Sequence, residues 1–82
     1  MNRAEVEKKF KQIVADIFRR NVKELKGSTE FVKDLNAKSL DIAALIAATE
    51  SEFGIRTTSA ETRKNKNISQ TVNYIMKKMK GK

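Results

Sequence analysis

Phe31-Val-Lys-Asp-Leu-Asn-Ala-Lys-Ser39-Leu-Asp-Ile-Ala-Ala-Leu45 is the stretch in which a loop gives way to a helix. Before Ser39, the polar residues Asp34, Asn36 and Lys38 interrupt any apolar period. After Ser39, apolar or neutral side chains recur at the spacing of one helix face. They are Ile42, Leu45, Ile46, Thr49 and Phe53. We therefore expect a helix over residues 39–53, with Ser39 at or next to its N-cap.

The position of Ser39 allows two roles. A serine hydroxyl at a helix start can accept a hydrogen bond from an unpaired backbone N–H, and serine is a common N-cap. Asp41, in the first turn, suits the positive end of the helix dipole. The same helix end is also a favourable place for a phosphate group. Position alone favours the ordinary cap, and both roles remain open at this point.

A first amphipathic helix is expected over residues 3–20, where Asn2 and Glu5 have the spacing of a capping box. Its apolar face comprises Val6, Phe10, Ile13, Val14, Ile17 and Phe18. Residues 21–38 then form a long connection with a turn at Gly27-Ser28-Thr29. Its apolar residues are expected to fold back on the helices. They are Val22, Leu25, Phe31, Val32 and Leu35.

Two further helices are expected after Gly54, a plausible C-terminal residue of the helix over 39–53. Thr58 and Glu61 suggest a capping box for a short helix near 59–65. Asn67 and Gln70 suggest the start of another near 68–79. Its buried stripe is Ile68, Val72, Ile75, Met76 and Met79. The fold class is therefore all-α: a four-helix bundle with a long first loop and a short third helix.

Composition narrows the function classes. The 82 residues suit one small domain, residues 1–82, and we expect a monomer. The sequence has no cysteine and no histidine, so we expect neither a metal site nor a catalytic Ser–His pair. No run approaches the roughly 18 apolar residues of a membrane span, and no signal-peptide core follows Met1. We expect a cytoplasmic protein that is not an enzyme.

The net charge of +8 is unevenly distributed. Residues 1–20 carry +3, residues 21–55 carry −2 and residues 56–82 carry +7. The segment that contains Ser39 is therefore mildly acidic, whereas the C-terminal third is strongly basic. A basic block of this kind can attract nucleic acid, anionic lipid or an acidic protein surface.

Three segments resemble the acyl carrier protein family. Asp34-Leu35-Asn36-Ala37-Lys38-Ser39-Leu40-Asp41 is similar to the family's Asp-Leu-Gly-Ala-Asp-Ser-Leu-Asp. Glu50-Ser-Glu-Phe-Gly-Ile55 and Val72-Asn-Tyr-Ile75 resemble two later motifs, in register and without gaps. The resemblance implies a 4'-phosphopantetheine arm on Ser39 that holds an acyl group as a thioester. It also implies the carrier type of four-helix bundle.

The resemblance also implies roles for other residues. Lys38, Leu40 and Asp41 would flank Ser39 as recognition residues. Partner enzymes would dock on Leu40, Ala44, Ala47, Glu50 and Arg56. The expected partners are a phosphopantetheinyl transferase and the enzymes of fatty acid, lipid or polyketide biosynthesis that load or use the acyl group.

The chain departs from the family pattern in ways that mark an atypical, basic member. Lys38 stands where the family has an acid, and the C-terminal third is basic where the family is usually acidic. These changes suggest partners with acidic docking patches, or contact with an anionic membrane surface. Thr62 and Asn65 stand where the family usually has apolar core residues, which would loosen the space between the second and third helices.

Two other interpretations compete with the carrier. A small basic helical module can bind nucleic acid, although Tyr74 is the only plausible exposed stacking residue, which ranks this below a carrier. A carrier-like interaction module that is never modified would also fit, because Lys38 changes the recognition motif. The sequence does not indicate the acyl cargo, the pathway or the individual partner enzymes.

Overall fold

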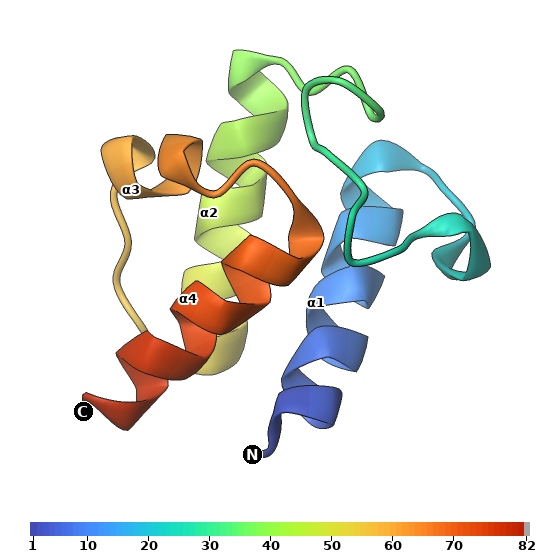
Figure 1. Ribbon diagram of the computed structural model, residues 1–82. Coiled ribbons are helices and arrows are strands. Elements are labelled where there is room, and N and C mark those ends of the chain that lie inside the picture. The colour runs from blue at the N-terminus through green and yellow to red at the C-terminus, as the bar shows by residue number, and fades with distance from the viewer. Residues whose placement is uncertain (82) are drawn as a thin grey trace.

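Figure 1 shows the computed structural model, which describes residues 1–81 and leaves Lys82 outside. Helix α1 (Arg3–Phe18) begins at the expected capping box. Glu5 N–H donates to the Asn2 side chain over 2.9 Å, and Asn2 N–H donates to the Glu5 carboxylate over 3.5 Å. The prediction that this helix continues to residue 20 was wrong. Arg19 adopts a left-handed conformation, with φ of 55°, and ends the helix.

The long connection after α1 contains one short 3₁₀ turn, η1 (Val22–Glu24). Leu25, Phe31 and Leu35 are buried, as expected, and the Phe31 ring meets the Phe10 ring edge-on at 6.1 Å between centroids. Val22 and Val32 do not fold inward: their side chains are 38% and 69% exposed. The prediction was wrong for these two residues, because the connection turns inward only at Leu25, Phe31 and Leu35 and leaves the side chains between them outside.

The connection is fastened to the start of the last helix by backbone hydrogen bonds. Ile68 N–H donates to the Thr29 carbonyl over 3.1 Å, and Ser69 N–H donates to the Gly27 carbonyl over 2.8 Å. Phe31 N–H donates to the Lys66 carbonyl over 3.1 Å. These bonds hold the loop backbone in a defined position beside α4, although the loop forms no β-strand.

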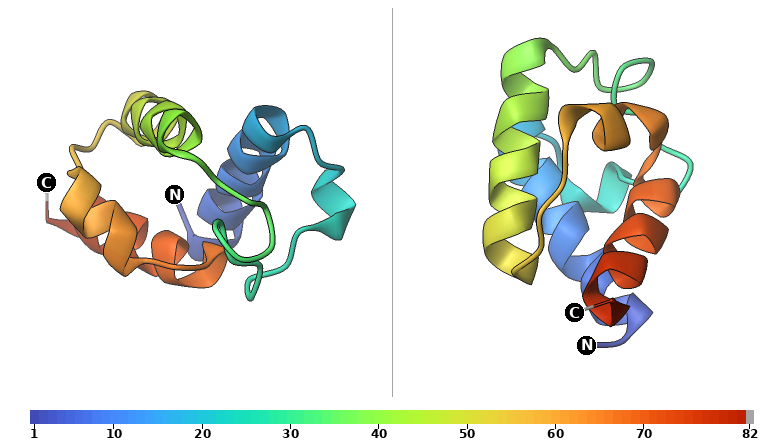
Figure 2. Two further views of the ribbon diagram at one scale, coloured as in Figure 1. Left: turned by 90° about the horizontal axis from the view of Figure 1, so that it is seen from above. Right: turned by 90° about the vertical axis from the view of Figure 1, so that its left-hand side faces the viewer.

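The remaining helices are α2 (Ser39–Phe53), α3 (Ser59–Lys64) and α4 (Ile68–Lys80). Gly54, with φ of 62°, ends α2, and the Asn67 side chain accepts from Gln70 N–H at the start of α4 over 2.8 Å. The expected all-α bundle with a short third helix is confirmed. Figures 1 and 2 show the start of α2, the loop before it and α3 at one end of the bundle, and both termini at the other.

The core lies where α1 packs against both α2 and α4. Its largest fully buried side chains are Phe10, Ile68, Ile75, Val6, Val14 and Val72. Met76 and Met79, which were expected in the buried stripe of α4, are only partly buried against this core. Ile55, which was not expected in the core, is buried there.

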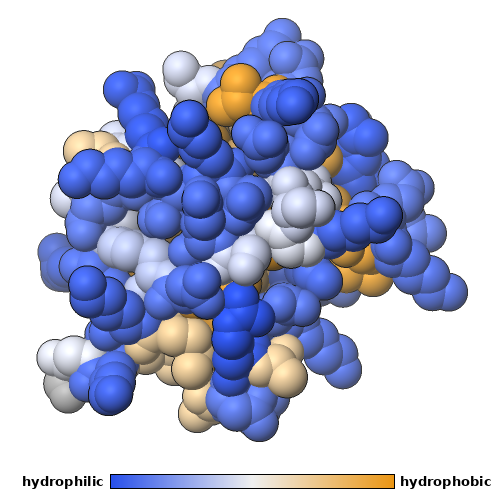
Figure 3. Space-filling model, in the orientation of Figure 1, coloured by the Kyte–Doolittle hydropathy of each residue, from blue (hydrophilic) through white to orange (hydrophobic). Residues whose placement is uncertain are grey.

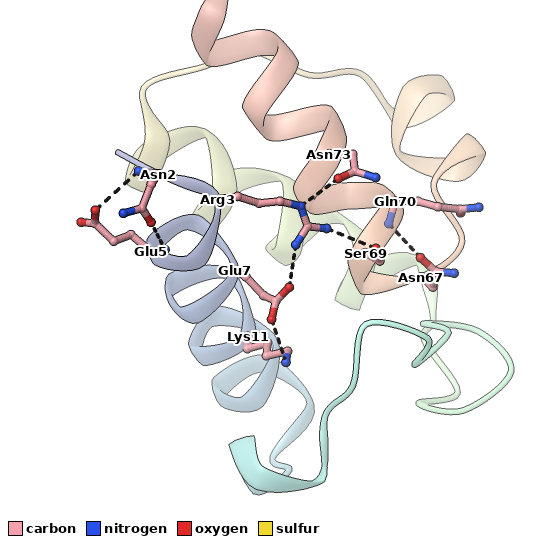
Figure 4. Close-up of polar contacts among 9 residues, drawn as sticks. All are labelled: Asn2, Arg3, Glu5, Glu7, Lys11, Asn67, Ser69, Gln70 and Asn73. Atoms are coloured by element: carbon pink, nitrogen blue, oxygen red, sulfur yellow. Dashed lines mark hydrogen bonds and ion pairs between the residues drawn. The ribbon is translucent and has the colours of Figure 1, made fainter.

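Arg3 joins α1 to α4 at the surface of the bundle. Its guanidinium donates to the Asn73 side-chain oxygen over 3.0 Å and to the Ser69 hydroxyl over 3.2 Å (Figure 4). The same group pairs with Glu7 at 2.9 Å, and Lys11 pairs with Glu7 at 3.2 Å. Together these two cations lower the pKa of the Glu7 carboxyl, Lys11 more strongly than Arg3.

Hydrophilic side chains cover most of the face shown in Figure 3, and apolar ones appear only as small separate areas. Within residues 1–81, no helix has the length and apolarity that a membrane crossing requires.

Candidate functional site

Ser39 is the first residue of α2, and its side chain is exposed. The N-cap is Lys38, whose backbone N–H donates to the Asp41 carboxylate over 3.0 Å. The Ser39 hydroxyl makes no hydrogen bond with any part of the chain that the structure describes. Asp41 thus stabilises the start of the helix, and the Ser39 hydroxyl is not used as a cap.

A cleft of about 660 Å³ opens beside Ser39. Three segments form its walls: the loop before α2, the first turns of α2, and the segment from the start of α3 to the start of α4. The lining residues are Glu30, Phe31, Val32, Lys33, Ala37, Ser39, Ile42, Ala43, Ser59, Thr62, Arg63, Asn65 and Lys66. A group attached to the Ser39 oxygen would therefore start at the edge of a recess that is apolar along α2, mixed on the loop side and polar on the α3 side.

The cleft is positively charged. Lys33, Arg63 and Lys66 line it, against one carboxylate, that of Glu30. None of the three cationic side chains makes an ion pair or a hydrogen bond to another described residue. Unpaired cations at the edge of a partly enclosed recess raise the local concentration of anions. The charge balance therefore suits a phosphate group bound close to Ser39.

Four of the five expected docking residues lie on α2, and they differ in how far their side chains are exposed. Leu40 is 84% exposed, and Ala44 and Ala47 are also exposed. Glu50, by contrast, turns its carboxylate toward the connection after α2 and accepts from Thr57 N–H over 2.9 Å. Arg56 lies beyond the far end of the helix, which spans about 22 Å from Ser39 to Phe53 at 1.5 Å per residue.

Two further carboxylates, one in the loop before α2 and one on the last turn of α2, are also engaged within the chain. Asp34 accepts from Glu30 N–H over 2.8 Å, and Glu52 pairs with Lys9 at 3.5 Å. Across residues 1–81, no group of three or more acidic, cysteine or histidine side chains could hold a metal ion.

The sequence did not identify Lys33, Ser59 or Arg63 as site residues. Lys33 lies in a loop whose sequence has no helical or strand periodicity from which its orientation could be predicted. Its place in the cleft depends on the backbone hydrogen bonds between that loop and the start of α4. A signal existed for Arg63 and Lys66, because both belong to the basic C-terminal third. That signal did not show that they line the same cleft as Ser39.

Comparison with known proteins bears on this site. Residues 8–75 match the family model described as "Phosphopantetheine attachment site". The acyl carrier protein of Buchnera aphidicola is 37% identical over 75 residues, which cover 92% of this chain and 95% of that protein. The acyl carrier protein of Clostridium acetobutylicum is 42% identical over 67 residues, which cover 82% of this chain and 87% of that protein.

A solved structure of the acyl carrier protein from Enterococcus faecalis superimposes with a TM-score of 0.80 at 26% identity. The match covers 95% of this chain and 99% of that one. Since the family model spans most of the chain and curated relatives match nearly all of it, the chain belongs to the acyl carrier protein family.

Proposed function

We propose that Ser39 carries a 4'-phosphopantetheine arm and that the chain presents an acyl group, held on this arm as a thioester, to partner enzymes. The observation that carries this proposal is the Ser39 hydroxyl, which is exposed, makes no hydrogen bond to any of residues 1–81 and lies at the edge of the cleft. When bound, the arm supplies the thiol. The chain itself has no cysteine to compete with it.

The residues around Ser39 fit a phosphodiester. Lys33 and Arg63 line the cleft together with Ser39, and no carboxylate among residues 1–81 pairs with either of them. A phosphate on the Ser39 oxygen would gain favourable charge–charge contacts from them, and the start of α2 adds its own positive dipole. Asp41 would act indirectly by holding the Lys38 backbone, and so the helix start, in place.

The flanking residues would serve recognition. Leu40 is almost fully exposed next to Ser39, so a transferase or a partner enzyme can bury it on contact. Ala44 and Ala47 extend an apolar strip along α2. Because Glu50 and Glu52 are engaged within the chain while Lys38 and Arg56 are exposed, we expect partner enzymes with an apolar recess bordered by carboxylates.

In this proposal the chain is a non-catalytic carrier. Other enzymes attach the arm, load the acyl group and use it. The chain contributes an accessible hydroxyl, a fixed helix start and a surface for docking. The chain has no histidine, the commonest general base, and no cysteine nucleophile, which fits this division of labour.

The test is the intact mass of the protein after incubation with coenzyme A and a phosphopantetheinyl transferase. Wild type should gain the mass of one arm, and Ser39→Ala should gain none. Ser59→Ala is the matched control, because Ser59 lines the same cleft and its loss leaves Ser39 in place. Labelling of Ser39→Ala would contradict the proposal. So would a folded wild-type protein that no transferase of several distinct kinds can label.

A further inference from the structure

We propose that Lys33 and Arg63 bind the diphosphate of coenzyme A beside Ser39 before the arm is transferred, so that this chain supplies cations to its own modification. The inference rests on the proposed attachment at Ser39 and goes one step further back, from the attached phosphodiester to its donor. Three features support it: where the two cations lie, what holds them there, and what the transfer requires.

Each of the three walls of the cleft contributes one of these residues. Ser39 is the first residue of α2, Lys33 belongs to the loop before it, and Arg63 belongs to α3. A third cation, Lys66, and one carboxylate, Glu30, complete the charged lining, which is positive overall. The volume of about 660 Å³ is typical of sites that take a small ligand. A diphosphate that enters beside the Ser39 hydroxyl therefore meets cations from the loop wall and from the α3 wall.

Both walls are held in place by bonds that do not use the two cationic groups. In the loop, Phe31 N–H donates to the Lys66 carbonyl over 3.1 Å. In α3, the Glu61 carboxylate pairs with Lys78 of α4 at 3.9 Å. The side chains of Lys33 and the α3 arginine are exposed, and neither forms an ion pair or a hydrogen bond with any of residues 1–81. Their charges are therefore available to an anion, and their backbones do not have to be ordered when it binds.

The transfer itself calls for such cations. The Ser39 oxygen forms a new bond to the phosphorus that bears the pantetheine group, and the bond from that phosphorus to the bridging oxygen breaks. Adenosine 3',5'-bisphosphate leaves with the bridging oxygen, and the hydroxyl proton passes to a base on the transferase. Negative charge builds up on the bridging oxygen as its bond breaks. Phosphoryl transfer is therefore accelerated mainly by positioning of the phosphates and by cations placed against them.

The first experiment measures the rate of arm transfer from coenzyme A by one transferase, with intact mass as the readout. Arg63→Gln and Lys33→Gln each remove one charge and should each lower kcat about 10- to 100-fold. The KM for the carrier should change little, because the lost contact is made to the donor. Arg63→Lys keeps the charge and should recover most of the rate.

Lys64→Gln is the matched control. Lys64 is the next residue of α3 and is also exposed, but it lies outside the lining of the cleft. Its replacement removes the same charge from the same helix and should leave kcat unchanged. Circular dichroism establishes that each variant keeps the fold, as expected for exposed side chains that hold no other part of the described chain.

A second experiment needs no transferase. Coenzyme A at millimolar concentration is added to the Ser39→Ala chain, which cannot take the arm, and the NMR signals of the protein are followed. We expect the signals of Lys33 and Arg63 to shift, those of Lys80 at the far end of α4 to stay in place, and the shifts to shrink in 0.5 M salt. Shifts confined to residues outside the cleft, or no shifts, would overturn the inference.

Equal kcat values for wild type, Arg63→Gln and Lys33→Gln would overturn it as well. So would a loss confined to the KM for the carrier, because that result would assign the two cations to docking on the transferase. A wild-type protein that never gains the arm would instead refute the proposed function. Intact mass of the treated wild type distinguishes these failures.

Discussion

The side-chain carboxylate of Glu50, on the last turn of α2, accepts a 2.9 Å hydrogen bond from the backbone N–H of Thr57, seven residues further along the chain. This bond closes the connection between α2 and α3 around Gly54. Glu50 belongs to a motif that resembles one of the family's, and the resemblance implies a docking role for its carboxylate. In this structure the carboxylate instead has a partner within the chain. The distinction can be tested, because structural and docking roles predict different effects of its removal.

Replacement of Glu50 by alanine should lower the free energy of unfolding by about 1–3 kcal/mol, because the half-buried Thr57 N–H loses a charged acceptor. Urea denaturation measures this change. Glu52→Ala is the matched control: Glu52 makes an exposed pair with Lys9 at 3.5 Å, and its loss should cost less than about 1 kcal/mol. If Glu50→Ala unfolds like wild type but binds a partner enzyme less tightly, the docking role is correct.

Gly54 provides a prediction about the backbone. Its φ of 62° lies in the left-handed region, which residues with a Cβ rarely adopt, so Gly54→Ala should destabilise the protein by roughly 1–2 kcal/mol. Gly81→Ala is the control. Gly81 has φ of −80°, and a Cβ there would make only ordinary contacts, 3.7 Å from two carbonyl oxygens. Thermal unfolding should therefore be nearly unchanged for Gly81→Ala, and equal losses at both glycines would contradict the backbone argument.

The contacts of Arg3 predict that the surface between α1 and α4 contributes measurably to stability. Arg3→Ala removes hydrogen bonds to Asn73 and Ser69 and the pair with Glu7, and should cost about 1 kcal/mol (Figure 4). Lys8→Ala, on the exposed part of the same helix, removes a cation that makes no such bonds to the described residues and should be almost neutral. A loss no larger for Arg3→Ala than for Lys8→Ala would show that these bonds add nothing to stability.

Glu7 gives a prediction about pH. Lys11 and Arg3 lower the pKa of its carboxyl from the ordinary 4.5, so the folded state favours the ionised form. The resulting stabilisation is present above the ordinary pKa and is lost as the pH falls through the lower, folded-state value. Glu7 is partly exposed, so the effect should stay below about 1 kcal/mol. Urea unfolding of Glu7→Gln should vary less with pH over this range than wild type, and 1 M salt should shrink the difference. Identical pH profiles for the two proteins would contradict this assignment.

Much of the fold was predictable from sequence because its signals are local. The pairs Asn2–Glu5 and Asn67–Gln70 mark helix starts by a three-residue spacing, and the structure shows the corresponding hydrogen bonds. The apolar period correctly placed Phe10 and Ile75 in the core. Arg19 was missed because its left-handed conformation ends a helix without glycine, which no residue-type rule would indicate.

The site was harder to predict, because its parts meet through long-range contacts. The cleft depends on hydrogen bonds between the loop and the start of α4, such as Phe31 N–H to the Lys66 carbonyl, which leave no pattern in the sequence. For the same reason the sequence did not show that Lys33 and Arg63 would line the same cleft as Ser39. Nor did it show that Asp41, rather than Ser39, would stabilise the helix start.

Peptide mapping of the transferase-treated protein tests the attachment of the arm to Ser39 most directly. Cleavage after Lys38 and Arg56 releases the peptide 39–56, which contains both Ser39 and Ser51. Fragmentation of this peptide by tandem mass spectrometry assigns the added mass to one residue. We expect it on Ser39 alone, with Ser28, Ser51, Ser59 and Ser69 unmodified. An arm found on any of those four serines, or none on the peptide 39–56 of a folded and treated protein, would contradict the assignment.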